Sequence, residues 1–403
     1  MRSVLAFAKN YMVSFLELPN SCWPRIILSL INATSGGIVF FLSFYFVKIL
    51  HINIVTAGAM ISCYGVGTIA GGFLGGKLSD KFSPSRISII SIFCNAVVFL
   101  LFLKLTHVTE LILCLMLWGT SSYIFKTANN TFVLRQCKSG DAEKLNAINI
   151  LYTASNLGMG ISAMIVSFFS QYGFHYIFML FAIMMSLVGC YLIFEQNSQQ
   201  KNIHLNPVLT QMVEGYHQKD NKIVMLGLGC LFLIGLIIAQ LGTTYPIYLH
   251  DLFPQMGLKS SGYLFIINTI LIVLLQVPVV GYFKHHNKIL MMGIGALLYG
   301  LGMAMLSVAV YYWIAVLACL VESLGEMIFI SLAQLVCYQY ADEKKKGESL
   351  GRYQSVFATS VVVGPYLGAL VYHHFGGKII WYLSGIIGMV CLIACVVFVK
   401  KKN

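Results

Sequence analysis

Charged residues are scarce in this chain. Asp, Glu, Lys and Arg account for 10% of the 403 residues, whereas ordinary soluble domains contain about 25%. Apolar residues account for 58% of the chain, and the mean hydropathy is +0.82. This balance excludes the two or three soluble domains that the length alone would suggest, and it predicts a membrane protein.

The patterns of a catalytic or metal-binding protein are also missing. The eleven cysteines form no CxxC pair and lie mostly within apolar runs. The pairs His285-His286 and His373-His374 have no cysteine or carboxylate cluster nearby. Neither a nucleophile–base arrangement nor a phosphate-binding loop occurs. The sequence therefore predicts no metal, no cofactor and no enzyme activity.

Apolar runs of about 20 residues, long enough to span a bilayer core of about 30 Å as helices, recur along the chain. Six precede the polar stretch Glu195–Lys222 and six follow it. We expect twelve transmembrane helices, at about 26–47, 56–77, 87–105, 110–134, 146–169, 175–194, 223–249, 260–283, 289–308, 312–337, 350–373 and 379–399. The expected domains are an amphipathic cytoplasmic segment over 1–24, a six-helix bundle over 25–194, a cytoplasmic linker over 195–221 and a second six-helix bundle over 222–403.

The net charge of +12 is spread over short loops rather than gathered on one surface, so we expect no nucleic-acid partner. With the N-terminus inside, the inner segments hold 21 Lys and Arg residues and the outer loops hold 4. Basic residues favour the cytoplasmic side of a membrane. We therefore expect both termini and the linker to be cytoplasmic.

A glycine-rich run ends the second span. Gly67, Gly71 and Gly75 fall on one helical face, where small residues let two helix backbones approach closely in lipid. A short charged loop follows and leads into the third span. Such a loop lies at a membrane face, because hydrocarbon does not accommodate exposed backbone.

This loop resembles the signature between the second and third helices of the major facilitator superfamily. Gly76, Asp80, Lys81 and Arg86 match it, whereas serines replace its second glycine and one basic residue. The resemblance implies a gating loop, in which the carboxylate of Asp80 meets the start of span 11 and latches the outward-facing state. A carboxylate stabilises a helix N-terminus by about 0.3–1 kcal/mol.

The two halves form a weak repeat, because span 8, a short basic loop and span 9 match spans 2 and 3. Repeated six-helix halves with the site between them are a transporter architecture. The resemblance therefore implies an all-α membrane protein of two pseudo-symmetric six-helix bundles, the major facilitator fold.

The likeness extends over nearly the whole chain. The stretches 64–80, 152–158, 268–278, 325–326 and 351–353 are similar to bacterial multidrug–proton antiporters, which implies a bacterial cytoplasmic (inner) membrane. Lys126, Tyr152, Asn156 and Gly325-Glu326 also resemble proton-coupled oligopeptide transporters.

Two departures leave the direction of transport open. The Glu-x-x-Glu-Arg signature of the peptide transporters is missing from span 1. The Gly-Pro signature of the antiporters is missing from span 5, and Gly364-Pro365 lies in span 11 instead.

Three charged residues lie deep within spans. Lys126 is about 16 residues into span 4 and Glu326 about 15 residues into span 10, so both lie about 22–24 Å from the outer face. Such residues are costly unless they pair or function, at about 2.5–3.5 kcal/mol on insertion scales. In the superfamily fold these two spans are symmetry mates that face the cavity, which implies that Lys126 and Glu326 meet there.

Glu322 lies one helical turn from Glu326 on the same face. Two carboxylates this close disfavour double ionisation in a low dielectric, so one of them holds a proton readily. We expect Glu326, Glu322 and Lys126 to couple transport to protons; the alternative is a static ion pair of Lys126 with a glutamate.

Polar and aromatic residues within the other spans are candidates for the lining of a substrate cavity. Each alternatively forms a packing contact or a helix–helix hydrogen bond. The candidates are Asn32, Trp118, Tyr123, Asn129, Asn130, Tyr152, Asn156, Gln240, Tyr245, Asn268 and Gln276.

These features predict a monomeric, proton-coupled secondary transporter that works by alternating access and exports a small amphipathic compound, such as a drug-like molecule or siderophore. The alternative is a proton symporter that imports a nutrient, peptide-like molecule or siderophore. A non-transporting membrane scaffold is the alternative from another class, but it would not need three deep charges.

The charge asymmetry of the loops predicts the topology. Reporter tags at either terminus or within 195–222 should be accessible only from the cytoplasm, which a periplasm-active enzyme fusion at each position measures. A fusion that scores as exported at any of these positions would contradict the twelve-span arrangement.

Overall fold

The computed structural model describes residues 18–137, 141–199, 220–283, 286–340 and 346–402. Within these residues the regular structure is helical, and twelve segments are long and apolar enough to cross a membrane. The prediction of an all-α membrane protein with twelve spans is confirmed. The predicted amphipathic segment over 1–24 lies largely outside the described residues, as does most of the linker over 195–221.

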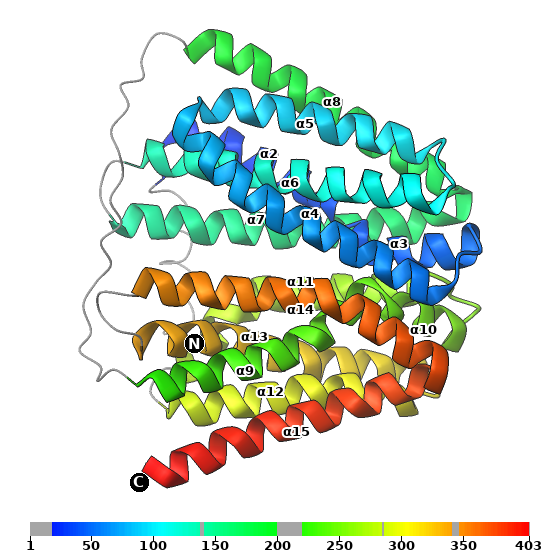
Figure 1. Ribbon diagram of the computed structural model, residues 1–403, viewed down its shortest axis with the longest axis vertical. Coiled ribbons are helices and arrows are strands. Elements are labelled where there is room, and N and C mark those ends of the chain that lie inside the picture. The colour runs from blue at the N-terminus through cyan, green and yellow to red at the C-terminus, as the bar shows by residue number, and fades with distance from the viewer. Residues whose placement is uncertain (1–17, 138–140, 200–219, 284–285, 341–345, 403) are drawn as a thin grey trace. The chain divides into compact units, whose positions relative to one another are not determined.

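The first six spans are built from ten elements (Figure 1). They are η1 (Asn20–Cys22), α2 (Trp23–Gly36), α3 (Val39–Phe44), η2 (Tyr45–Ile49), α4 (Ile54–Lys81), α5 (Pro84–Phe102), α6 (Val108–Gln136), α7 (Asp141–Phe169), η3 (Ser170–Tyr172) and α8 (Phe174–Gln199).

The last six spans are built from nine elements. They are α9 (Asn221–Ile238), η4 (Ala239–Gly242), α10 (Thr244–Leu252), α11 (Lys259–Phe283), α12 (Lys288–Met305), η5 (Leu306–Val308), α13 (Tyr312–Gln339), α14 (Lys346–Phe375) and α15 (Gly377–Lys402).

The first span of each half is broken. The sequence predicts one span over 26–47, but Gly37-Ile38 separates α2 from α3. It predicts another over 223–249, but η4 and the non-helical Thr243 (φ −129°, ψ −82°) separate α9 from α10. Glycine weakens a helix interior, and Pro246 is tolerated because it lies in the first turn of α10. The two breaks occupy equivalent places in the predicted repeat.

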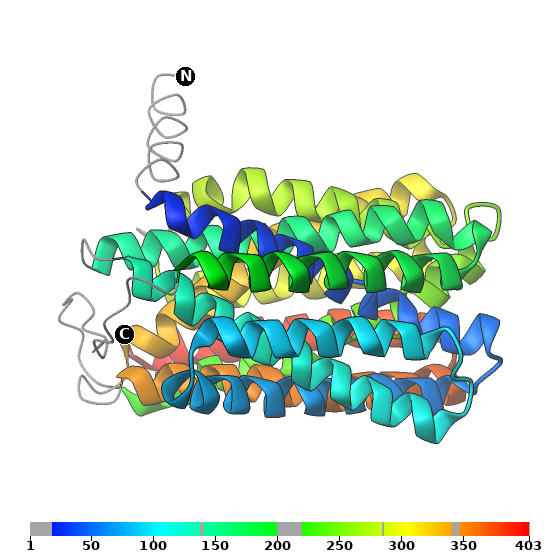
Figure 2. The same cartoon turned by 90° about the horizontal axis from the view of Figure 1, so that it is seen from above.

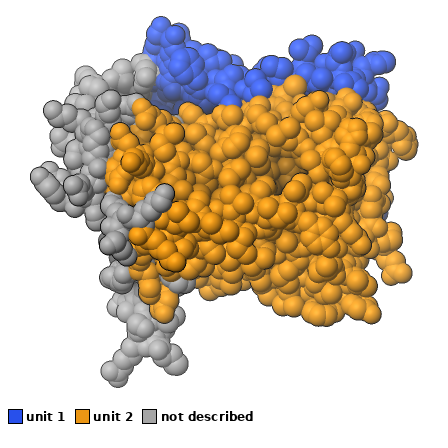
Figure 3. All heavy atoms as spheres, turned by 60° about the horizontal axis from the view of Figure 1, so that its bottom comes forward, with its two compact units in different colours: residues 1–38, 66–162, 172–214 blue, residues 39–65, 163–171, 215–403 orange. Residues whose placement is uncertain are grey.

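The chain forms two compact units, coloured in Figure 3. Unit 1 contains residues 1–38, 66–162 and 172–214, and unit 2 contains residues 39–65, 163–171 and 215–403. Unit 2 therefore includes the C-terminal half together with two pieces of the N-terminal half. The predicted domain division at 195–221 stays a prediction.

Unit 1 is held together by α5, which lies beside α6 and α8 (Figure 1, Figure 2). Aromatic side chains fill the space between these helices. The Trp118 ring packs edge-on against Phe99 and Phe102 at centroid distances of 5.3 and 6.2 Å, and Phe102 stacks on Phe178 at 5.2 Å. Such pairs stabilise a core beyond their buried area.

The predicted glycine stripe lies against α6. A Cβ atom added to Gly67, Gly71 or Gly75 would collide with the α6 backbone at Met116, Thr120 or Ile124. Added to Gly72 or Gly76, it would meet open space. The prediction that this face lets two helix backbones approach closely is confirmed.

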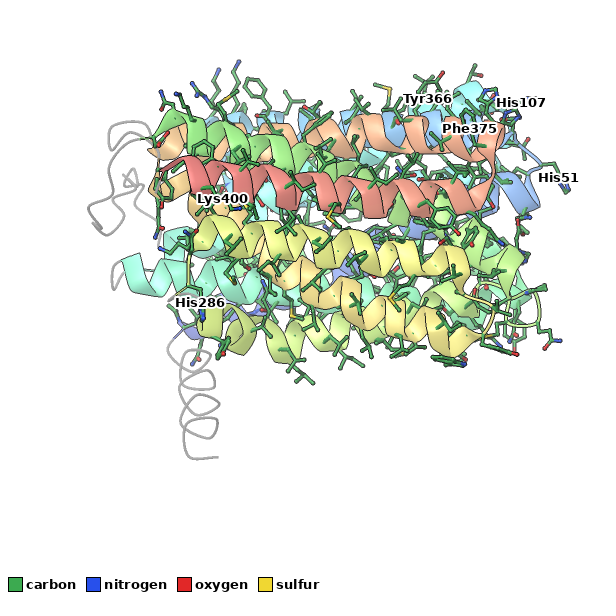
Figure 4. The ribbon with its side chains drawn as sticks, turned by 90° about the horizontal axis from the view of Figure 1, so that it is seen from below. His51, His107, His286, Tyr366, Phe375 and Lys400 are labelled. Atoms are coloured by element: carbon green, nitrogen blue, oxygen red, sulfur yellow. The ribbon has the colours of Figure 1, made fainter. Side chains whose placement is uncertain are left out.

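Unit 2 is organised around α12, which packs closely on α13 and α15. Gly302 faces the backbone of Glu322, and Gly325 faces the backbone of Tyr299, so the α12–α13 contact is made backbone to backbone. In Figure 4, His51 and Phe375 lie at one end of unit 2, and His286 and Lys400 lie at the other.

The glycine stripe gives a matched test of helix packing in unit 1. Gly71→Ala should lower the stability by about 1–3 kcal/mol, because its Cβ has no space beside Thr120. Gly72→Ala should be neutral or slightly stabilising, because alanine favours helix and the position is open. The apparent melting temperatures of the two detergent-solubilised variants measure the difference, and equal values would contradict the packing described.

Candidate functional site

Two glutamates on α13 form the most unusual polar group of unit 2. Glu322 is 4% exposed, and among the described residues it forms no hydrogen bond. Glu326 accepts a hydrogen bond from Nδ2 of Asn268 on α11 at 3.1 Å. The same amide donates to Oγ of Ser323 at 3.0 Å. Asn268, a predicted cavity residue, therefore joins α11 to the carboxylate of Glu326.

The surroundings of Glu322 are aromatic rather than basic. Its Cβ lies against Gly302 of α12, and it interacts electrostatically with Tyr245 and Tyr299. The hydroxyl of Tyr299 is buried, and among the described residues it has no hydrogen-bond partner. A carboxylate in such a place is costly as an ion.

Neither carboxylate forms an ion pair with a described basic residue. The two acids lie one helical turn apart and interact with each other. Two negative charges this close are unfavourable where little water screens them. The chemistry that this arrangement offers is therefore the uptake and release of a proton.

Lys126, the predicted partner of Glu326, lies on α6 of unit 1. Its side chain is exposed, and its Nζ lies 5.2 Å from the centre of the Tyr123 ring. Among the described residues Lys126 forms no ion pair. The two residues belong to different units, so their meeting stays a prediction.

Gln240 is the centre of the break between α9 and α10. Its Nε2 donates to the carbonyl groups of Leu236 and Gly364, each at 2.9 Å. Its Oε1 accepts from the hydroxyl groups of Thr243 at 3.2 Å and Thr244 at 3.1 Å. This predicted cavity residue is buried, and its amide satisfies backbone groups at the break and in α14, beside Pro365.

Residues 39–65, the N-terminal piece of unit 2, also contact the break between α9 and α10. Oγ of Ser43 on α3 donates to the carbonyl of Thr243 at 2.7 Å. The Phe265 ring of α11 contacts Phe40 at 5.2 Å and Tyr245 at 5.6 Å. Tyr245, another predicted cavity residue, is thereby buried among aromatic rings.

An ion pair lies at the end of these contacts. Nζ of Lys48 lies 2.6 Å from Oδ1 of Asp251, and both side chains are partly exposed. Nδ1 of His250 lies 2.9 Å from the same oxygen, and the His250 ring packs on Phe44. The predicted topology puts this cluster on the outer side. An exposed pair contributes about 0–1 kcal/mol, so the cluster is easily separated.

Unit 1 contains a buried ion pair that the sequence analysis did not predict. Nη2 of Arg25 lies 2.7 Å from Oε2 of Glu195, and it donates to Oγ of Ser85 at 2.8 Å. The guanidinium also lies 4.0 Å above the Phe132 ring. Arg25 is fully buried at the start of α2, so the pair ties together α2, α5, α6 and α8. In the sequence, Arg25 is one of the inner basic residues and Glu195 begins the polar stretch after the sixth span, so neither position by itself indicates a pair.

Three predicted cavity residues lie inside unit 1. Asn129 donates to the carbonyl of Arg25 at 2.8 Å and to Oγ of Ser29 at 2.9 Å. Asn32 accepts from Nδ2 of Asn95 at 3.4 Å. With Trp118, these residues are buried in contacts between helices.

The other predicted residues are more accessible. Tyr123 and Tyr152 are exposed, whereas Asn130, Asn156 and Gln276 are half-buried. In the predicted gating loop, Lys81 and Arg86 are exposed and Gly76 faces open space. Asp80 lies in α4, but its side chain is outside the described residues.

Comparison with known proteins supplies the family. The model of the Major Facilitator Superfamily matches residues 26–348. The chain belongs to this superfamily. It is therefore a multi-pass membrane transporter rather than an enzyme, and its fold is the facilitator fold that the sequence predicted.

Two relatives from Bacillus subtilis (strain 168) carry the same family name. The MFS-type transporter YqjV is 23% identical over 371 residues, which cover 89% of this chain and 88% of the relative. The MFS-type transporter YttB is 23% identical over 364 residues, which cover 89% and 90%.

Solved structures agree on the fold. A variant of the nucleoside transporter NupG superposes with a TM-score of 0.78 at 14% identity, covering 94% of this facilitator and 99% of that chain. A variant of the peptide transporter POT in complex with alafosfalin superposes with a TM-score of 0.74 at 16% identity, covering 94% and 93%.

The buried ion pair of this facilitator should be structural. Arg25→Met should cost about 3–5 kcal/mol, because it leaves the Glu195 carboxylate buried without its cation. The double variant Arg25→Met/Glu195→Met should regain at least half of the loss, since an apolar pair removes the stranded charge. Thermal unfolding in detergent measures both, with Lys104→Met, which removes an exposed charge of unit 1, as the control. A double variant no more stable than Arg25→Met would contradict the role of the pair.

Proposed function

We propose that this facilitator is a proton-coupled secondary active transporter that exports a small amphipathic organic compound by alternating access. The observation that carries the proposal is the pair Glu322 and Glu326 within α13, one buried and the other held by Asn268. A carboxylate pair inside a membrane helix is costly and is retained where it works.

Glu326 is the coupling site in this scheme. In one conformation its ionised carboxylate pairs with Lys126 across the cavity. A proton on Glu326 removes the charge, releases Lys126 and favours the other conformation. A proton shifts such an equilibrium only by its different affinity for the two conformations. Support comes from the exposed Lys126, which has no ion pair among the described residues, and from the hydrogen bond that orients Glu326.

Glu322 has a supporting role in the scheme. It is more deeply buried than Glu326 and has no hydrogen bond among the described residues. Glu326 therefore gains or loses its proton beside a second acid. When Glu322 is charged, the ionised form of Glu326 is more costly.

Alternating access also requires contacts that break. On the predicted outer side, Lys48–Asp251 and Ser43–Thr243 join N-terminal pieces to C-terminal helices within unit 2. These contacts would separate when the cavity opens outward. In that conformation Asp80 would meet the start of α14, with Gly76, Lys81 and Arg86 shaping its loop.

The substrate is proposed from the accessible candidates of the cavity. Tyr123 and Tyr152 offer aromatic surface, and Asn130, Asn156 and Gln276 offer amide groups. Such a mixture suits a small molecule with apolar and polar parts. Likeness of the α4 and α7 stretches to multidrug–proton antiporters favours export. The alternative is proton-driven uptake of a nutrient; two of the structural neighbours are named as a nucleoside transporter and a peptide transporter.

The central test separates coupling from binding. Glu326→Gln keeps the hydrogen-bonding shape of the side chain but removes its exchangeable charge. It should abolish uphill transport driven by a pH gradient while it retains substrate binding and exchange. A compound screen with a deletion strain and an overexpressing strain supplies the substrate, and flux into proteoliposomes with an imposed gradient gives the readout.

The matched control is Glu110→Gln, which removes an exposed carboxylate at the start of α6. It should transport as the parent does. Uphill transport by Glu326→Gln at the parental rate would contradict the assignment and shift it to Glu322. The direction of the pH gradient that drives substrate uptake distinguishes the two proposals. An antiporter, as export requires, takes up substrate while protons leave the liposome, whereas a symporter takes it up while protons enter.

A further inference from the structure

A groove opens on unit 1 between α4, α5 and α6. Its cavity volume is about 370 Å³, and it is lined mainly by apolar side chains, including Leu78, Phe82, Ile90, Leu117 and Ile124. Ile90 is 72% exposed and Phe82 is 59% exposed. Apolar surface of this extent needs an apolar cover, which a lipid chain supplies in a membrane.

The hydroxyl groups in the groove wall are already used. Ser91 donates to the Ile87 carbonyl at 2.7 Å, and Thr120 donates to Met116 at 2.8 Å. The groove therefore offers its occupant almost no hydrogen bonds along its length. A small polar substrate would lose its own hydrogen bonds there, whereas a hydrocarbon chain would lose none.

One end of the groove does offer hydrogen-bond donors. Arg86 lines the groove from the first turn of α5, and its side chain is exposed. Among the described residues it makes no hydrogen bond and no ion pair. Lys77 and Lys81 of the adjoining α4 end are exposed as well. From Arg86 to Cys94, the farthest lining residue of α5, the helix rises about 12 Å.

We propose that this groove binds an anionic phospholipid, with one acyl chain between α4, α5 and α6 and the phosphate on Arg86. An arginine binds phosphate through paired N–H donors. The predicted topology puts Arg86 at the cytoplasmic face, where anionic lipids attract clustered basic residues. The lipid would fix the start of α5 beside the end of α4, so the proposed gating loop would depend on membrane composition.

Lipid retention by the purified full-length protein tests the proposal. Native mass spectrometry counts the lipids bound after titration with phosphatidylglycerol or with phosphatidylcholine of the same chain length. The parent protein should retain phosphatidylglycerol preferentially. Arg86→Gln should weaken that retention about five-fold, the usual effect of one basic residue at a membrane surface. Lys222→Gln removes an exposed charge at the start of α9, outside the groove, and should retain the lipid as the parent does.

A second pair of variants tests the apolar part. Ile90→Trp should fill the groove and lower retention of both lipids, while its exposed position leaves the core intact. Val97→Trp puts the same side chain on an exposed position of α5 outside the groove and should change nothing. Equal losses for Arg86→Gln and Lys222→Gln would overturn the proposal in favour of general surface charge. An effect of Ile90→Trp without one of Arg86→Gln would overturn it in favour of a neutral amphiphile, such as the substrate.

Discussion

The cost of an ion in a low dielectric distinguishes the two buried groups of charged residues in this transporter. Arg25 and Glu195 are buried against each other, so the charges cancel and the pair ties four helices of unit 1 together. Glu322 and Glu326 have no such partner among the described residues of unit 2. The Arg25–Glu195 pair needs no further partner. The repulsion between ionised Glu322 and Glu326 is removed when one of them binds a proton. The free-energy cost of burying an ion therefore accounts for both the structural role of the first pair and the proposed transport role of the second.

Close helix packing gives these sites their positions. Gly67 and Gly71 bring α4 onto the backbone of α6, and Gly302 brings α12 onto α13 at Glu322 itself. Where a span is not helical, polar side chains form hydrogen bonds with the backbone groups that lack helical partners. Gln240 satisfies carbonyl groups at the break between α9 and α10, and Ser43 donates to Thr243 there. Within a membrane, non-helical backbone of this kind is stable only where protein or water satisfies its polar groups.

The sequence predicted the spans and the contact face of α4 because both depend on local order. Hydropathy over about 20 residues locates a span, and spacing by four positions puts Gly67, Gly71 and Gly75 on one side of a helix. It did not predict the Arg25–Glu195 pair, since 170 residues separate the partners and nothing local links them. Lys126 and Asn129 of α6 were both predicted as site residues, but the sequence did not predict that their surroundings differ. Asn129 turns to Ser29 within unit 1, whereas Lys126 is exposed.

The central claim is that one acid of the α13 pair carries a proton while the other is ionised. Infrared difference spectroscopy of the membrane-reconstituted transporter tests it without knowledge of the substrate, because a protonated carboxyl group absorbs apart from a carboxylate. The account predicts a protonated-carboxyl band at neutral pH that is lost in the one variant, Glu322→Gln or Glu326→Gln, that replaces the protonated acid, and that survives in Glu110→Gln. A spectrum in which neither α13 variant changes the band, or in which the band is missing from the parent, would contradict it.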